Sequence, residues 1–225
     1  MNKTHKKLAI YMALALMAVG TQARADDDDN NNNFNYEITV TNVTRGQSFT
    51  PILVATHRAG VNLFTEGSPA SPELALVAED GDTVPLEAKL RANPNVLQVT
   101  TTGDLDPGKS VTVKIRAQKS FDHISLTSML VTTNDAFFAL NGVRGPRGSR
   151  ILSLDSPAYD AGSEPNDELC ANIPGPICRG QGASPNAGGE GFVHIHAGIH
   201  GIGNLSAADR DWRNPVAEIT IRRVP

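Results

Sequence analysis

Tyr36-Glu37-Ile38-Thr39-Val40-Thr41-Asn42-Val43 is the stretch that decides the fold, because apolar and polar residues alternate along it. Successive side chains of a β-strand point to opposite faces, so Tyr36, Ile38 and Val40 are expected to share one buried face. Aromatic residues make up only 5% of the 225-residue chain, while Val, Ile, Thr, Gly and Pro are frequent. This composition favours an all-β fold over a helical one.

Strand-like segments continue along the rest of the chain. They are predicted at residues 51–57, 95–101, 110–117, 123–132, 136–140, 150–154 and 215–224. Asn141-Gly142 is predicted to form a turn. Ser71-Pro72-Glu73 is typical of a helix start and predicts a short helix through Ala78; a second is expected from about residue 82 to 91. Such a pattern does not fit a parallel α/β fold, so we predict an antiparallel β-sandwich with one or two short helices in a connection.

The first 25 residues have the pattern of a cleavable signal peptide. Lys3, Lys6 and Lys7 precede an apolar run over 8–19, and Ala23-Arg24-Ala25 offers the small-x-small cleavage site. The apolar run is too short to span a bilayer. We therefore predict a secreted or periplasmic protein without a transmembrane segment, an acidic and Asn-rich disordered lead-in over 26–35, and one domain over 36–225.

Charge and context exclude two classes of partner. Residues 1–25 hold four basic residues and no acid, so their removal changes the formal net charge from −4 to −8. An acidic chain without a basic stripe is a poor binder of nucleic acid. Gly103 to Ser110 match the phosphate-loop pattern G-x-x-x-x-G-K-S, but a strand pattern follows where a nucleotide site needs a helix, so we predict a tight turn and no nucleotide.

An acidic loop is the first candidate site. Residues 154–168 contain five carboxylates, together with Pro and Gly that prevent a regular helix or buried strand. Loops rich in oxygen suit calcium, which takes roughly six to eight oxygen ligands. Asp160 and Glu164 are candidate ligands, with Asp135 reaching in from the end of a neighbouring strand. The alternative is a solvated acidic surface loop without an ion.

The histidine-rich segment near the C-terminus is a second candidate. His194 and His196 are expected on one face of a strand, with His200 close behind, a spacing that suits zinc or copper. The alternative is a structural role in hydrogen bonding. Cys170 and Cys178 are the only two cysteines, and an even pair in an exported protein predicts a disulfide.

Several separated motifs give the chain a resemblance to a known family. They are Val54-Ala55-Thr56-His57, Thr133-Asn134-Asp135-Ala136-Phe137, Tyr159-Asp160-Ala161-Gly162 and Asp211-Trp212-Arg213-Asn214-Pro215-Val216-Ala217. In this order they resemble the spondin N-terminal domain in its stand-alone bacterial form, from about Tyr36 to Val224. The resemblance implies an antiparallel β-sandwich with a bound calcium ion, and it carries the acidic ligands over to Asp135, Asp160 and Glu164. Glu164 departs from the Asp expected there in animal members.

Two functional hypotheses follow from these observations. The first is a non-enzymatic, calcium-binding module for adhesion or for binding an unidentified protein or glycan at the cell envelope or outside the cell. The second is a transition-metal-binding protein or metalloenzyme that uses His194, His196 and His200. Because neither a Gly-x-Ser-x-Gly nor a His-Glu-x-x-His pattern occurs, the first hypothesis is favoured and no enzyme is predicted.

Overall fold

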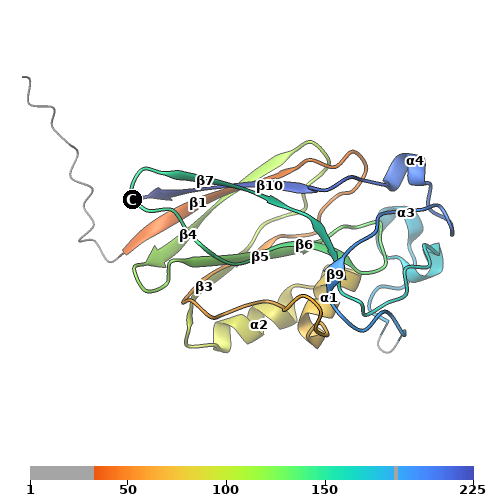
Figure 1. The fold of residues 1–225 in the computed structure, drawn as a ribbon, viewed down its shortest axis with the longest axis horizontal. Helices are drawn as coiled ribbons and strands as arrows, with labels where there is room; N and C mark the ends of the chain where they lie inside the picture. Colours follow the sequence, from red (N-terminus) through yellow and green to blue (C-terminus); the bar gives the residue numbers. More distant parts are fainter. Residues whose placement is uncertain (1–32, 185–186) are drawn as a thin grey trace, which may run out of the picture.

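The structure, a computed structural model, describes residues 33–184 and 187–225. Its two antiparallel sheets face each other and confirm the predicted β-sandwich (Figure 1). The predicted signal peptide at 1–25 and residues 26–32 of the predicted lead-in lie outside the described residues. No helix in the described part of the chain is both long enough and apolar enough to cross a membrane.

The first sheet has the strand order β4 (Ser110–Gln118), β1 (Asn33–Asn42), β10 (Ala217–Val224) and β7 (Ile151–Ser156). β1 pairs with β4 on one side and with β10 on the other, so its backbone is hydrogen-bonded along both edges. Its alternation works as predicted: Tyr36, Ile38 and Val40 face inward and are at most 1% exposed. The first and last strands of the described chain therefore lie side by side at the centre of this sheet.

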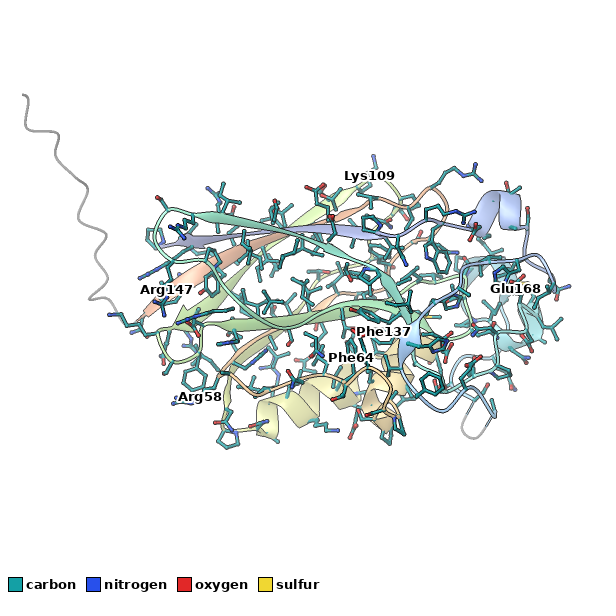
Figure 2. The ribbon with its side chains drawn as sticks, in the orientation of Figure 1. Arg58, Phe64, Lys109, Phe137, Arg147 and Glu168 are labelled. Carbon is teal, nitrogen blue, oxygen red and sulfur yellow. A yellow bond between two sulfur atoms is a disulfide. The ribbon has the colours of Figure 1, made fainter. Side chains whose placement is uncertain are left out.

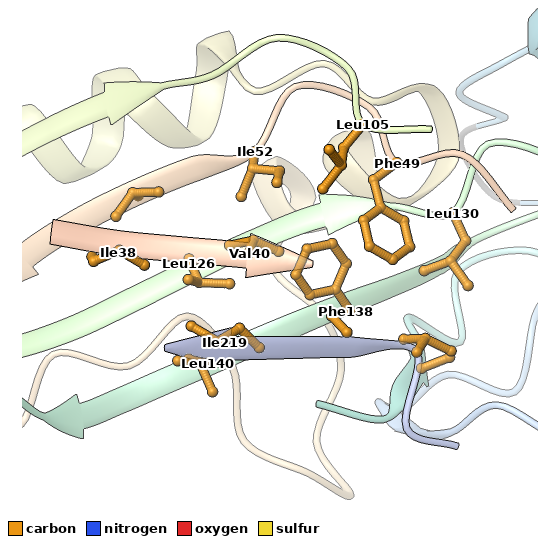
Figure 3. Close-up of a cluster of buried hydrophobic side chains, with 14 of the residues drawn as sticks. Ile38, Val40, Phe49, Ile52, Leu105, Leu126, Leu130, Phe138, Leu140 and Ile219 are labelled. Atoms are coloured by element: carbon orange, nitrogen blue, oxygen red, sulfur yellow. The ribbon is translucent and has the colours of Figure 1, made fainter. Parts of the chain in front are cut away.

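The second sheet has the order β3 (Val96–Thr101), β2 (Leu53–His57), β5 (His123–Met129), β6 (Ala136–Arg144), β8 (Ala158–Asp160) and β9 (His194–Ile195). The main core lies between the sheets. Phe49 and Phe138 pack together there with ring centroids 4.4 Å apart, among aliphatic side chains of both layers (Figure 3).

Two helices cover the outer face of the second sheet. α1 (Pro72–Asp80) and α2 (Val84–Ala92) stand on the connection where the sequence predicts them, and Ser71 caps α1. Leu74 and Val77 of α1 pack in a second core with Leu53, Phe137 and neighbouring side chains (Figure 1). Because helices cover one face and the other sheet covers the opposite face, all five residues of β2 are buried.

Several predicted boundaries need correction. The stretch 154–168, expected to be a loop throughout, contains the end of β7 and the whole of β8. β1 begins at Asn33, so residues 33–35, which we expected in the lead-in, pair within the sheet. β5 ends at Met129 rather than Thr132. Asn141-Gly142 is not a turn between strands but lies inside β6, where the β5–β6 register shifts and Gly142 adopts a φ of 69°. The pair makes a bulge, in which glycine accommodates the left-handed backbone.

Long loops gather at one end of the sandwich, away from the C-terminus (Figure 1). They carry the short helices η1 (Cys170–Asn172), α3 (Gly175–Cys178) and α4 (Ala207–Arg210). The acidic loop and the histidine segment both belong to this end, which is therefore the place to look for a site.

Candidate metal centre

Strand pairing brings the two predicted acidic positions together. In the β6–β8 ladder Ala136 stands opposite Asp160, so Asp135, which immediately precedes Ala136, lies beside the end of β8. The backbone N–H of Ala161 donates to the carbonyl oxygen of Asp135 over 3.2 Å. A rigid sheet can hold residues from distant parts of the sequence next to one another. Here the pairing of β6 with β8 places the backbones of Asp135 and Asp160 side by side.

Asp135 is fully buried, and its two carboxylate oxygens have different surroundings. Oδ2 accepts hydrogen bonds from the backbone N–H of Ser163 (2.8 Å), the backbone N–H of Glu164 (3.1 Å) and the Ser163 hydroxyl (3.2 Å). Oδ1 has no partner. Burial raises the pKa of Asp135 to about 7, with the nearby Asp160 carboxylate adding to the increase and the hydrogen bonds from residues 163 and 164 opposing it.

Asp160 is also fully buried, and each of its oxygens accepts a hydrogen bond. Oδ1 accepts from the backbone N–H of Gly162 (2.7 Å), and Oδ2 accepts from the Asn166 side-chain amide (2.6 Å). Burial raises its pKa, while these two hydrogen bonds lower it. The carboxylate is therefore held in one orientation by its own loop.

Glu164 is the least satisfied member of the predicted set. It is 1% exposed, and neither of its carboxylate oxygens has a hydrogen-bond partner. Burial raises the pKa of Glu164 to about 8; the nearby Ser184 hydroxyl opposes this increase, and the negative charges of Glu79, Asp135 and Asp167 add to it. The Ser184 hydroxyl itself donates to the carbonyl of Gly182 over 3.1 Å. A buried carboxylate without a partner is unfavourable when ionised, so this position calls for a proton or a cation.

The closest three-residue grouping differs from the predicted one. Within the described ranges, the only three His, Cys, Asp or Glu side chains whose ligand atoms all lie within 4.8 Å of one another belong to Asp160, Glu190 and His194. Asp135 and Glu164 are linked through the hydrogen bond from the Glu164 backbone to Asp135, but neither belongs to a group this tight. Asp160 thus stands between two groups of potential ligands.

The three histidines have separate environments. His194 Nδ1 lies 3.8 Å from Asp160 Oδ1. His196 is 5% exposed, packs against Trp212 with ring centroids 5.1 Å apart, and places Nε2 3.8 Å from Asp160 Oδ2. His200 is exposed. In the described ranges the three imidazoles therefore do not form a group within 4.8 Å of one another; only His194 joins such a group.

Glu168 has a role that sequence reasoning did not assign. Its buried carboxylate accepts hydrogen bonds from three successive backbone N–H groups, those of His200 (2.5 Å), Gly201 (2.7 Å) and Ile202 (3.0 Å). Figure 2 shows Glu168 at the loop-bearing end of the molecule. The acidic loop is thereby tied to the segment after the histidines. The five carboxylates of residues 154–168 identify this stretch as a candidate site, but no sequence pattern indicates which of them accepts hydrogen bonds from backbone N–H groups.

A disulfide reinforces the same end. Cys170 and Cys178 are bonded, as predicted, and the short ring that they close contains η1 and α3. The side-chain amide of Asn134, which precedes Asp135, donates a hydrogen bond to the Asp167 carboxylate over 3.1 Å. This bond links the end of the β5–β6 connection to the acidic loop just before Cys170. The loops around the acidic residues are thus held by covalent and polar links as well as by the sheet.

Comparison with known proteins places the chain in a family. The model of the Spondin_N family matches residues 31–144, half of the sequence, a range that includes Val54-Ala55-Thr56-His57 and Thr133-Asn134-Asp135-Ala136-Phe137. Asp160, Glu164 and Glu190 lie beyond the matched range. No curated protein matches the chain. Because the family model matches half of the sequence, and because the chain folds as the expected β-sandwich, we conclude that it belongs to the spondin N-terminal domain family.

Proposed function

We propose that this spondin-like chain is an exported, non-enzymatic module that binds calcium and serves adhesion or binding at the cell envelope or outside the cell. The observation that carries the proposal is the set of buried carboxylate oxygens without partners, which are Oδ1 of Asp135 and both side-chain oxygens of Glu164. Calcium would supply the missing partner.

The chemistry of this donor set fits a hard cation. Asp135, Asp160 and Glu164 offer oxygen alone, and they come from a loop as well as from strand ends. Calcium accepts irregular arrangements of oxygen ligands at 2.3–2.6 Å, whereas magnesium demands near-octahedral geometry and dehydrates reluctantly. The residues that would hold calcium are therefore Asp135, Asp160 and Glu164.

The expected role of the ion is structural. Asp135 precedes β6, Asp160 ends β8, and Glu164 lies in the loop that follows, so one cation among them would fasten the loop to the sheet. It would also offset the repulsion among these carboxylates and the neighbouring Glu79 and Asp167. Adhesion by such a module would use the loops that the ion orders.

Thermal unfolding of the purified protein with calcium or with a chelator tests the calcium proposal. Calcium at 100 times its dissociation constant is expected to stabilise the folded state by about 2.7 kcal/mol. Glu164→Gln, which removes the charge and keeps the size, should abolish this gain. Asp155→Asn is the matched control, because Asp155 is an exposed carboxylate in the same stretch and should leave the gain unchanged. Identical unfolding curves with calcium and with chelator would refute the proposal.

Adhesion and export have tests of their own. Purified protein should be retained on bacterial envelope fractions or on a glycan array in calcium and released by a chelator. Retention that is absent under both conditions would contradict a binding function.

Mass spectrometry of protein recovered from periplasm or medium should show a chain that lacks residues 1–25, and an intact N-terminus there would contradict a cleaved signal.

A further inference from the structure

Asp160, Glu190 and His194 form a mixed cluster of two carboxylates and one imidazole at the edge of the second sheet. Their ligand atoms all lie within 4.8 Å of one another. Asp160 is buried, His194 has a side chain 32% exposed, and Glu190 is exposed. The cluster therefore combines a fixed inner group with two outer groups that solvent can reach.

Strand pairing and close loop packing assemble this cluster. Asp160 and His194 are direct partners in the β8–β9 ladder, and paired residues present their side chains on the same face. The backbone N–H of Gly191 donates to the carbonyl of Gly162 over 2.8 Å, which brings Glu190 alongside. Gly162 makes this approach possible, since its φ is +66° and a Cβ there would lie 2.4 Å from the carbonyl oxygen of Phe192.

Asn166 holds the two carboxylates near each other. Its side-chain Nδ2 donates to Asp160 Oδ2 over 2.6 Å and to Glu190 Oε1 over 3.4 Å. His194 is oriented by its neighbour Phe192, whose ring lies 5.2 Å from the imidazole and whose carbonyl accepts from Nδ1 over 3.2 Å. In the neutral ring Nδ1 then carries the hydrogen, so Nε2 is the nitrogen with a lone pair for a metal. All three members of the cluster thus have partners that limit their orientations, as outer-shell residues do at metal sites.

An unpartnered and almost completely buried nitrogen points at the same group. His196 has a side chain 2% exposed, and its Nε2 has no hydrogen-bond partner and faces Asp160 Oδ2 at 3.8 Å. The backbone N–H of Gly198 donates to His196 Nδ1 over 2.9 Å, so Nε2 carries the hydrogen. At 3.8 Å this N–H is beyond hydrogen-bond distance of Asp160, and it can donate to the carboxylate only if the two atoms approach by about 1 Å. A protonated nitrogen cannot itself bind a metal, so we assign His196 a positioning role.

From these observations we infer that Asp160, Glu190 and His194 form a second cation site, specific for a first-row divalent transition metal such as Zn²⁺. An imidazole with two carboxylates is a ligand set that zinc accepts, and three protein ligands leave a fourth position for water or a partner's side chain. Calcium prefers oxygen and gains little from an imidazole. The site shares only Asp160 with the proposed calcium ligands, and its other two ligands, Glu190 and His194, have no part in the calcium proposal.

Zinc titration by calorimetry in saturating calcium tests this inference, with Co²⁺ absorption as a second probe of imidazole coordination. His194→Ala and Glu190→Gln are each expected to weaken zinc binding by at least the roughly 10–100-fold that the loss of an outer-shell partner costs at metal sites. His200→Ala is the matched control, because His200 is exposed and lies outside the cluster. Unchanged zinc affinity in His194→Ala would overturn the site, and an equal loss in His200→Ala would point instead to the histidines alone.

The role of His196 has a separate readout. His196→Gln keeps an N–H donor near Asp160 and should retain the zinc affinity, whereas His196→Ala should weaken it about 10-fold. If both variants bind zinc like the unaltered protein, the positioning role is wrong. The loops are checked in each variant by circular dichroism and by the thermal unfolding curve.

Glu164→Gln separates this inference from the calcium proposal. This variant should lose stabilisation by calcium and keep its zinc affinity, while His194→Ala should do the reverse. Zinc binding that disappears in Glu164→Gln, or zinc that calcium displaces competitively, would show one site instead of two and would overturn the inference. Failure of calcium to stabilise the unaltered protein would refute only the calcium proposal.

Discussion

His57 illustrates a polar side chain that the core fully accommodates. It is 0% exposed on β2, its Nδ1 donates to the carbonyl of Arg58 over 2.8 Å, and its Nε2 lies 2.9 Å from the Ser125 hydroxyl. Ser125 also accepts from the backbone N–H of Gly142, so its hydrogen is free to be donated to His57. Both ring nitrogens of this histidine are thus hydrogen-bonded, in contrast to the buried oxygens of Glu164, which have no partner.

This environment predicts how His57 links stability to pH. Burial lowers the pKa of His57, and the charge of His123 lowers it further, against an opposing effect of the Arg58 carbonyl. The folded state therefore favours the neutral ring, and its stabilising effect is complete above the ordinary pKa of about 6.5 and is lost as the pH falls through the lower folded value.

Urea unfolding of His57→Gln at neutral and acidic pH measures this linkage. At neutral pH the variant should be less stable by about 1–3 kcal/mol, because a buried hydroxyl loses its partner. The difference from the unaltered protein should shrink as the pH falls below about 6.5, where the unaltered protein must bury a charged ring. His200→Gln should change neither value, and a difference independent of pH would contradict this account.

The two ends of helix α1 are fixed by different factors: local sequence signals set its start, and a tertiary contact constrains its end. Ser71 accepts a hydrogen bond from the backbone N–H of Leu74 over 3.4 Å, and Pro72 occupies the first turn, as its sequence predicts. The other end stops at Gly81, whose φ is 68° and whose N–H donates to Val77. A Cβ on Gly81 would lie 2.5 Å from Cγ2 of Thr50, a contact that no local pattern reveals.

The two ends should differ in their sensitivity to mutation. Gly81→Ala is expected to destabilise the protein by about 1–3 kcal/mol, because it combines left-handed backbone with a steric clash. Ser71→Ala should cost only about 0.5 kcal/mol, near the low end for a cap, because its hydrogen bond is long. Chemical unfolding of both variants checks the ranking, and an equal or reversed order would contradict it.

The elements also show which local patterns can mislead. Gly103 to Ser110 satisfy a phosphate-loop pattern, yet Lys109 N–H donates to the Asp106 carbonyl in a turn, and β4 begins at Ser110. Asn141-Gly142 has the usual sequence of a hairpin turn but makes a bulge, since β5 and β6 continue to pair beyond it at Ile124–Val143 and His123–Arg144. Pairing over a whole ladder outweighs the preference of two residues.

In the whole molecule, the β-sandwich holds a set of long loops at one end. The Cys170–Cys178 bond lies in those loops and not between the sheets, so it constrains the site end without joining the layers. The two sheets instead depend on the main core, in which Phe138 of β6 and Ile38 of β1 take part (Figure 3). Stability of the fold and order of the site end are therefore partly separate properties.

Replacement of both cysteines by serine tests this separation. The double variant should lose about 2–3 kcal/mol of unfolding free energy, as expected for closure of so short a ring. Its far-ultraviolet circular dichroism should still show the β-sandwich. Fluorescence of Trp212, which is 7% exposed and is the only tryptophan, reports on the site end. Loss of the β signal in the double variant would contradict this division.

Most of the fold could be predicted from sequence because its signals are local. Alternation in β1 and β10, the cap and proline of α1, and the pair of cysteines each act over a few residues. Spondin-like motifs added the family, which the Spondin_N match confirms. Asp135 and Asp160 lie at neighbouring strand ends, and the backbone of Glu164 donates to Asp135, while calcium binding by these residues stays a prediction.

What the sequence alone determined is the longer strands, the two helices α1 and α2, the family and the acidic character of one loop; β8 and the short helices η1, α3 and α4 were not predicted. Only the tertiary structure decided that Glu190 and His194 join Asp160, that Glu168 binds backbone, and that Glu164 is buried without a partner. The physical reason is that these contacts depend on how closely two loops approach, through Gly162 and Gly191, and on which carboxylate oxygen finds an N–H. Neither property has a periodic or short-range signature in the chain.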